Sequence, residues 1–443
     1  MKPNDITDTV LSRRALLFGG AAVGGSLLLS GCLGSGSPAP TPAPVSGSGA
    51  PAASGPVVLQ SSLSDPDPKA SLDALIEAYR ATGKEVTLNT VAIEQFRAQL
   101  PTYLSSANPP DVLTWYAGSV ARDYASKGLL LDLSELWTGD GACAKYADSL
   151  KALSTDATGK QIFVPTNYYW WSVFYRKSAF AEWGVTPPTT WDAFMTLCET
   201  LKGKGIDPLT CGTGSTAWMA SGWFDYLNLR INGAAFHREL LEGKHSFESA
   251  EVKKVMETYA TLVPYFDPKG RSYSWQEAVT PLINKKAGMY LVGAFITQAF
   301  AEEDQDDIDF FSVPAIDPSV PSAEEAPADG YFAAAGSKNP AGARELLSYL
   351  AQAKPQEDYI AKAKVANLPT SPDVDRTKFS ALVQKGMQLL DQTSDITQFF
   401  NRDSSDALQT TADAALTKFL DNPTDIDTIL KDWQAAAELV WSA

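Results

Sequence analysis

The chain has 443 residues, 44% of them hydrophobic, and a formal net charge of −16 at pH 7. A surface this acidic is repelled by phosphate backbones and anionic headgroups, which argues against nucleic acid and polyanions as ligands. Two histidines, and four cysteines without a CxxC pair, argue against a zinc site or a histidine-based triad. We therefore expect no metal-ligating site residue, no cofactor and no nucleic-acid partner, and whether a metal ion takes part stays open.

The N-terminal segment has the order of a bacterial export signal. Paired arginines precede an uncharged run, 15–31, that ends at Cys32. The run is shorter than the roughly 20 apolar residues of a bilayer-spanning helix, and is typical of a signal peptide instead. The letters LLSGC resemble a lipobox. We expect residues 1–31 to be a lipoprotein signal peptide and Cys32 to carry the lipid, and either the Sec or the twin-arginine route stays open.

The next segment, 32–56, consists almost wholly of Gly, Ser, Pro and Ala. It has little apolar surface to offset chain entropy, so we expect a disordered tether. Three cysteines would remain after lipidation. This odd count permits one disulfide, and Cys198 with Cys211 encloses the shortest loop, but the pairing stays open.

The first folded elements are predicted in the order strand, helix, strand. An apolar run, 57–62, precedes a segment with helical spacing, 70–83, and residues 84–91 then alternate as a strand does. This unit implies a parallel pair with a right-handed crossover. A further short strand is predicted within 109–118.

Helices are predicted at 187–205 and at 423–441, each with one apolar stripe. Along the chain, the predicted strands come first, then a mixture of strands and helices, and then helices. This order indicates α/β layers in more than one lobe. Between these elements, 163–175 carries seven aromatic rings in thirteen residues. Both alternating faces of the segment YYWWSVFYRK, 168–177, are apolar, which predicts a strand buried on both sides.

The aromatic residues suggest a sugar ligand. Sugars present apolar faces and many hydroxyls, so a sugar site combines flat rings with a few polar groups. The residues from Asn167 to Trp170 are the better ligand candidates of the aromatic run, whereas Val173, Phe174 and Tyr175 are expected in the core. No GxxxxGK[ST] or GxSxG motif occurs, and we expect a non-enzyme, although a carboxylate pair for glycoside hydrolysis stays open because such pairing is spatial.

The chain resembles the bacterial extracellular solute-binding protein family 1, the maltose-binding-protein-like lipoproteins that feed sugar ABC importers. The resemblance covers 57–443 and is carried by the order and spacing of several segments: 108–133 (NPPDVLTWYAG…), 163–194 (FVPTNYYWW…), 223–233 (WFDYLNLRING), 274–293 (SWQEAVTPLINKKAGMYLVG), 326–332 (APADGYF) and 396–405 (ITQFFNRDSS).

The resemblance implies a two-lobed α/β periplasmic-binding-protein fold of type II, the Venus-flytrap architecture, with three hinge crossings. The crossings are expected near 166–170, 288–294 and 340–343. The first lobe would then comprise 57–166 with 294–340, and the second 167–293 with 341–443.

The resemblance also implies a ligand site between the lobes. Carried over by position, the expected ligand-binding residues are Trp115, Asn167, Tyr168, Tyr169, Trp218, Trp275, Asp329 and Arg402. Asp329 would accept hydrogen bonds from sugar hydroxyls and Arg402 would donate them. Two departures are Ile93, where relatives often have histidine, and Asn401, where aspartate is common.

The expected function is the extracytoplasmic, lipid-anchored binding component of a carbohydrate ABC importer. Its expected partners are a mono- or oligosaccharide and the permease subunits, with the membrane reached only through the N-terminal lipid, and the protein is expected to be a monomer. Two alternatives are a secreted lipoprotein glycoside hydrolase and a surface adaptor or chemoreceptor-type binding protein.

Overall fold

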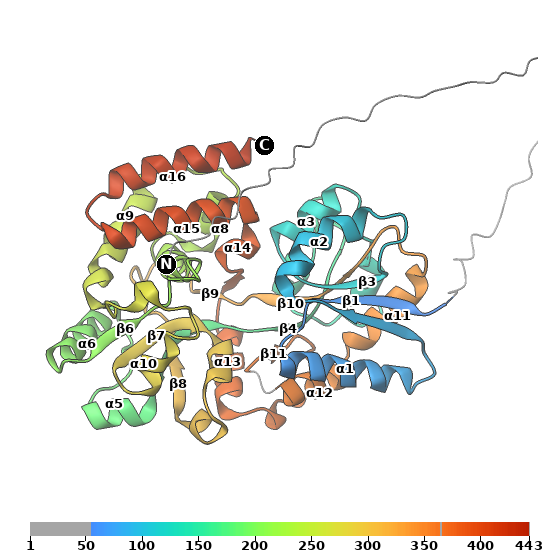
Figure 1. Ribbon diagram of the computed structural model, residues 1–443, viewed down its shortest axis with the longest axis horizontal. Helices are drawn as coiled ribbons and strands as arrows, with labels where there is room; N and C mark the ends of the chain where they lie inside the picture. The colour runs from blue at the N-terminus through green and yellow to red at the C-terminus, as the bar shows by residue number, and fades with distance from the viewer. Residues whose placement is uncertain (1–54, 364–365, 443) are drawn as a thin grey trace, which may run out of the picture. The chain divides into compact units, whose positions relative to one another are not determined.

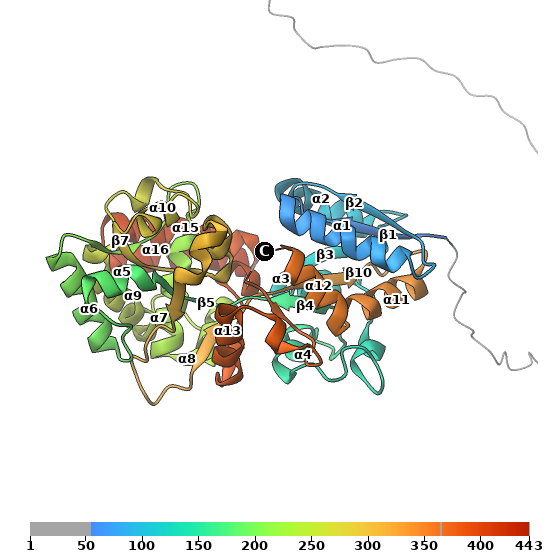
Figure 2. The ribbon, with the colours of Figure 1, turned by 90° about the horizontal axis from the view of Figure 1, so that it is seen from below.

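The computed structural model describes residues 55–363 and 366–442 (Figures 1 and 2). These residues form two lobes, each built on its own sheet and its own hydrophobic core. The first lobe contains a six-stranded sheet with the order β11–β4–β10–β3–β1–β2. Its strands are β1 (Val57–Ser61), β2 (Val86–Thr90), β3 (Val112–Tyr116), β4 (Val164–Tyr168), β10 (Ala328–Ala333) and β11 (Leu368–Pro369).

The predicted strand–helix–strand unit is confirmed, because β1 and β2 pair in parallel through α1 (Pro66–Arg80). The next strand, β3, pairs in parallel with β1, whereas β10 runs antiparallel to both β3 and β4. A Cβ at Gly330 would lie 2.1 Å from the carbonyl oxygen of Val164. Glycine is therefore required where β10 passes β4.

Helices cover the first sheet and bury their apolar faces in the first core. In Figures 1 and 2, α1 lies beside α12, with which it is in contact. The helices of this lobe are α1, α2 (Ile93–Ser105), α3 (Ser119–Ser126), η1 (Ser134–Trp137), α4 (Asp148–Leu153), α11 (Pro340–Leu350) and α12 (Ala353–Ala363).

The second lobe contains a four-stranded sheet with the order β6–β7–β5–β8, in which only β6 and β7 are parallel. A parallel pair, β9 (Ala323–Glu325) with β12 (Asp395–Thr397), lies apart from this sheet. The four main strands are β5 (Trp171–Arg176), β6 (Asp207–Thr210), β7 (Ala287–Gly293) and β8 (Ile308–Phe311).

Helices of the second lobe surround this sheet, and α15 packs against α16 (Figure 1). The α-helices are α5 (Lys177–Trp183), α6 (Trp191–Gly203), α7 (Met219–Ile231), α8 (Gly233–Leu241), α9 (Ala250–Leu262), α10 (Val279–Ile283), α13 (Ala381–Asp391), α14 (Phe400–Asp403), α15 (Asp406–Asp421) and α16 (Ile426–Trp441). The short 3₁₀ helices that follow the first lobe's η1 are η2 (Val263–Tyr265), η3 (Gly270–Ser272), η4 (Ala294–Ala299), η5 (Glu302–Asp307) and η6 (Arg376–Lys378).

The chain crosses between the lobes three times, as expected, but two crossings lie elsewhere than predicted. The first joins β4 to β5, close to the expected 166–170. The second lies between β9 and β10 instead of near 288–294, because β8 returns to pair with β5. The third lies between β11 and α13 instead of near 340–343, because α11 and α12 pack into the first core.

These crossings correct the expected lobe boundaries. Within 294–340, the part up to β9 belongs to the second lobe, since Ile296, Ile308 and Phe310 are buried in the second core. Within 341–443, the part up to β11 belongs to the first lobe. The tether and the signal peptide, 1–56, fall almost wholly outside the described residues and stay predictions.

Most of the aromatic run packs inside the second lobe. Val173, Phe174 and Tyr175 lie in its core, which confirms the prediction. Trp170 is fully buried against Phe174 and Phe310, so its candidacy as a ligand-binding residue is wrong. The strand β5 pairs with β7 and β8 along its two edges, and its residues from Trp171 to Tyr175 are buried on both faces.

The three described cysteines are free thiols, so the Cys198–Cys211 disulfide is not formed. The third is Cys143, and all three are buried. Burial raises the pKa of each thiol to about 12, which suppresses the reactive thiolate at neutral pH.

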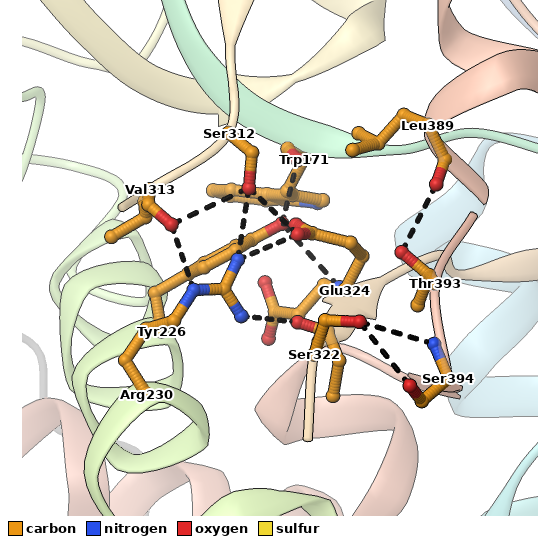
Figure 3. Close-up of polar contacts among 12 residues, drawn as sticks. Trp171, Tyr226, Arg230, Ser312, Val313, Ser322, Glu324, Leu389, Thr393 and Ser394 are labelled. Carbon is orange, nitrogen blue, oxygen red and sulfur yellow. Dashed lines mark hydrogen bonds and ion pairs between the residues drawn. The ribbon is translucent and has the colours of Figure 1, made fainter. Parts of the chain in front are cut away.

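A buried polar cluster anchors β9 to α7, as Figure 3 shows. The Arg230 guanidinium donates to Glu324 Oε1 at 2.6 Å and to the carbonyl oxygen of Val313 at 2.7 Å. The hydroxyl of Tyr226 lies 2.6 Å from the carbonyl oxygen of Trp171 and 3.0 Å from Glu324 Oε2. The cluster therefore ties β5, α7 and β9 together at the start of the second crossing.

Two further carboxyl groups, Asp225 and Glu325, are fully buried beside this cluster. Asp225 Oδ2 accepts a hydrogen bond from the backbone N–H of Phe400 at 2.9 Å. Burial raises the pKa of Asp225 to about 8. Burial and the neighbouring Asp225 carboxyl also raise the pKa of Glu325, so the pair retains protons that the unfolded chain would release.

Asp225→Asn should flatten the dependence of stability on pH. A carboxyl group with a raised pKa in the folded state lowers the free energy of unfolding as pH rises from about 4, its unfolded pKa, toward its folded value, here about 8. The asparagine variant should thus lose less stability between pH 5 and pH 8 in urea unfolding, whereas the exposed control Asp73→Asn should keep the parent's slope. An unchanged slope for Asp225→Asn would contradict this assignment.

Candidate ligand-binding cleft

A cavity of about 340 Å³ lies between the two lobes and is lined by residues of both. This volume is within the range of small-molecule sites, roughly 300–1,000 Å³. The first lobe contributes the ends of β3, β4 and β10, and the second contributes η4 and α14. The residues used below are Asp65, Ile93, Arg97, Trp115, Tyr116, Asn167, Tyr169, Phe295, Gln298, Asp329 and Arg402.

An ion pair between the lobes forms part of the cavity wall. Arg402 Nη1 on α14 donates to Asp329 Oδ1 on β10 at 2.5 Å. The guanidinium carbon lies 4.6 Å from the ring centroid of Tyr116 and 5.6 Å from that of Tyr169. Burial lowers the pKa of Arg402, but the charge and hydrogen bond of Asp329, together with Tyr169 and Tyr116, raise it by more, so the net pKa is raised and the guanidinium stays charged.

A β-bulge in β4 lies beside Asp329. Asp329 pairs with Asn167 and Gly330 pairs with Pro165, so one residue of β4, Thr166, has no partner on β10. Such bulges bend the strand and re-aim side chains next to binding sites. The same pairing places Asn167, whose Oδ1 accepts from Asn367 Nδ2 at 2.8 Å, beside Asp329.

A stack of rings forms the first-lobe wall at the C-terminal end of β3. Trp115 stacks on Tyr116 with 4.4 Å between ring centroids, and Phe96 of α2 stacks on the other side of Trp115 at 5.8 Å. Both wall residues are only 5% exposed. Ligands of α/β sheets gather at the carboxyl ends of strands, and here two rings close that end.

Phe295 of η4 supplies the ring on the second-lobe side. It meets Tyr169 edge-on at 5.6 Å and Trp275 at 4.8 Å between centroids. Trp171 lies behind it at 5.9 Å. The cavity therefore has aromatic surface on two sides and a charged pair between them.

Comparison with known proteins identifies the family. Residues 64–357 match the bacterial extracellular solute-binding proteins. The chain belongs to this family. An uncharacterised ABC transporter extracellular-binding protein of Pyrococcus horikoshii is 22% identical over 301 residues, which are 66% of either chain. The diacetylchitobiose-binding protein of Streptomyces coelicolor is 28% identical over 60% of either chain.

A solved structure of the bacterial solute receptor AcbH is also similar, with a TM-score of 0.80 and 29% identity. The match covers 88% of this chain and 99% of that one. A maltose-bound protein of the same two-lobed type has a TM-score of 0.69 at 15% identity, which shows the shared fold alone. The expected solute-binding-protein fold is thus confirmed.

Five of the eight expected ligand-binding residues of this solute-binding protein line the cavity: Trp115, Asn167, Tyr169, Asp329 and Arg402. The other three lie outside its lining. Tyr168 follows Asn167 on β4 and points to the opposite face, where burial raises its pKa to about 12. Trp218 packs against Trp171 and Phe399, and Trp275 lies behind Phe295.

Sequence reasoning missed Arg97, Phe295 and Gln298 as cavity residues. Arg97 could have been found, because it follows Ile93 by four residues on α2 and therefore shares its helix face. Phe295 comes two residues after β7, but its position depends on η4 folding back onto Tyr169. Spacing alone does not indicate that contact.

Neither a metal cluster nor a membrane span was found in the residues that the structure describes. Within 55–363 and 366–442, no group of three or more His, Cys, Asp or Glu side chains is arranged to hold a metal ion. No helix in these ranges combines the length and hydrophobicity that crossing a bilayer requires.

A double-mutant cycle on Arg402→Met and Asp329→Asn should reveal a stabilising coupling between the lobes. Because the side chains are 17% and 32% exposed, solvent screening limits the expected coupling to about 1–2 kcal/mol. The measurement is the free energy of urea unfolding of the parent, both single variants and the double variant. Additivity within about 0.5 kcal/mol would mean that the pair contributes nothing to stability.

Proposed function

We propose that the protein is the carbohydrate-binding component of an ABC importer and that its ligand binds in the cavity between the lobes. The observation that carries this proposal is the combination of rings from both lobes with the Asp329–Arg402 pair. Flat rings suit the apolar faces of a sugar, and carboxylate and guanidinium groups suit its hydroxyls. Trp115, Asn167 and Tyr169 complete the proposed set.

The similar proteins support a carbohydrate over other solutes. AcbH is described as having an exclusive preference for β-D-galactopyranose, and relatives include an α-glucoside-binding periplasmic protein of Rhizobium meliloti. Their ligands differ, so they support the class and not one sugar. As in other two-lobed binders, the ligand would favour the closed form by binding it more tightly, and the permease would recognise that form.

Trp115→Leu should weaken sugar binding by at least about tenfold, roughly 1.4 kcal/mol, because it removes the indole from the cavity wall. A thermal-shift screen first identifies a sugar that stabilises the parent, and calorimetry then compares the affinities. Trp183→Leu, on α5 away from the cavity lining, is the matched control. Unfolding temperature without ligand reports whether each variant is folded. A folded Trp115→Leu variant with parental affinity would contradict the proposed site.

The family consists of solute-binding proteins, and we expect no catalytic turnover. Hydrolysis by a glycosidase needs two carboxyl groups on either side of the scissile bond. Among the side chains that the structure describes, two carboxylates line the cavity, Asp65 and Asp329, and Asp329 is paired with Arg402. Incubation with an oligosaccharide panel should therefore release no products.

We expect Cys32 to anchor the protein by a lipid on the outer face of the cell membrane, although this residue lies outside the described ranges. The extracellular setting of the family supports this location. Cys32→Ala should abolish incorporation of labelled palmitate in cells, whereas Cys143→Ala, at a buried thiol, should retain it. Full labelling of the Cys32→Ala protein would exclude that residue as the lipid site.

A further inference from the structure

An arginine without a counter-ion lines the proposed sugar cavity. Arg97 belongs to the cavity lining on the first-lobe side. It forms no ion pair with any side chain that the structure describes, and its Nε is buried without a hydrogen-bond acceptor. An arginine that is partly removed from water usually pairs with an acidic group. Arg97 has no such partner within the described chain.

The neighbours of Arg97 do not compensate its charge. Four charged residues line the cavity in the described ranges: Asp65, Arg97, Asp329 and Arg402. Asp329 is paired with Arg402. Asp65 is solvent-exposed, so water screens its charge, and it forms no ion pair with Arg97. Among the side chains that the structure describes, Arg97 is therefore the one charged residue of the first-lobe wall without a nearby opposite charge.

Hydrogen-bond donors also gather around Arg97. Its guanidinium carbon lies 6.0 Å from the ring centroid of Tyr116, which the guanidinium of Arg402 also approaches. Within the described chain, the indole Nε1 of Trp115 is buried without a hydrogen-bond partner, and the buried hydroxyl of Tyr116 has no side-chain partner other than Arg97 itself. Guanidinium and indole groups can only donate. We call Arg97, Trp115 and Tyr116 the donor corner.

The donor corner suits a carboxylate of a ligand better than it suits a hydroxyl. A sugar hydroxyl carries its own proton and needs an acceptor for it, which Arg97 and Trp115 cannot provide, so the Tyr116 hydroxyl is the one acceptor among the three residues of the corner. A carboxylate only accepts, offers about four lone-pair sites, and matches a guanidinium in a bidentate geometry. A phosphate dianion would bring more charge than the single unmatched cation offsets.

We infer that the ligand is an acidic sugar, a saccharide with a uronic-acid carboxylate, and that Arg97 binds this carboxylate. This inference rests on the proposed carbohydrate function and narrows its substrate class. The rings of Trp115 and Phe295 would contact the sugar's apolar faces, and Asp329 would accept from its hydroxyls. Charge-assisted hydrogen bonds to Arg97 would then separate acidic sugars from neutral ones.

The test compares matched pairs of ligands by calorimetry. The pairs are D-galacturonate with D-galactose, D-glucuronate with D-glucose, and short oligosaccharides of each kind. The parent should bind at least one acidic sugar about tenfold or more tightly than its neutral counterpart, since hydrogen bonds to charged groups contribute about 1.5–3 kcal/mol. High salt should reduce this ratio.

Arg97→Gln keeps amide donors but removes the charge, and should bring the acidic-to-neutral affinity ratio close to one. Arg80→Gln removes one positive charge from the same lobe outside the cavity lining and should leave the acidic-to-neutral affinity ratio unchanged. This variant controls for the long-range electrostatic effect of losing one positive charge. The unfolding temperature without ligand shows whether each variant is folded, and Arg97→Lys provides a second variant that keeps the charge. That lysine variant should retain part of the preference.

The outcomes separate this inference from the proposed function. Binding of neutral sugars without binding of acidic ones would overturn the acidic-sugar inference and leave the carbohydrate function intact. A preference for acidic sugars that Arg97→Gln does not change would overturn the role of Arg97. If the folded parent binds no sugar of either kind, both proposals are overturned.

Discussion

The ion pair between Asp329 and Arg402 is the interaction on which the cleft depends. It connects β10 of the first lobe to α14 of the second and lies against the rings of Tyr116 and Tyr169. A guanidinium in this position loses hydration, and only a well-placed carboxylate offsets that loss. The bulge in β4 belongs to the same arrangement, because it lies next to the Asn167–Asp329 pairing at the cavity wall.

The aromatic run, 163–175, contributes both to the cavity lining and to the core of the second lobe. Asn167 and Tyr169 of this run line the cavity. Every ring of the following strand, β5, is buried in the core of the second lobe. Tyr169 is the last residue of the run that faces the cavity. From Trp170 onward the rings are buried in the core of the second lobe, so they stabilise the lobe and are not available to a ligand.

Much of the fold could be predicted because its signals are local. The β1–α1–β2 unit follows from apolar spacing within 35 residues, and the burial of β5 follows from its two apolar faces. The second and third crossings could not be placed this way. They depend on β8 pairing with β5 and on α11 and α12 packing against the first sheet, which are contacts between segments far apart in sequence.

The site residues show the same difference between local sequence signals and contacts made by distant segments. Asp329 and Arg402 lie in short motifs that the family resemblance marks, and the structure places both in the cavity wall. Trp218 and Trp275 were expected there by position, yet neither lines the cavity: Trp275 contacts the lining residue Phe295, and Trp218 contacts Trp171, which is itself outside the lining. Whether a second-lobe ring reaches the cavity depends on the packing of η4. Phe295 of η4 lines the cavity and contacts both Trp275 and Trp171.

Two kinds of polar cluster now have different physical roles. The Arg230–Glu324 cluster is buried and has internal partners for its guanidinium and carboxylate, so it holds β9 firmly where the chain leaves the second lobe. The donor corner has no such partners and lies at the cavity. A ligand can lower the free energy only where groups are unsatisfied, because satisfied groups gain nothing from it. Closure driven by a ligand must therefore draw on the donor corner and the rings, with the β9 anchor moving as part of a rigid lobe.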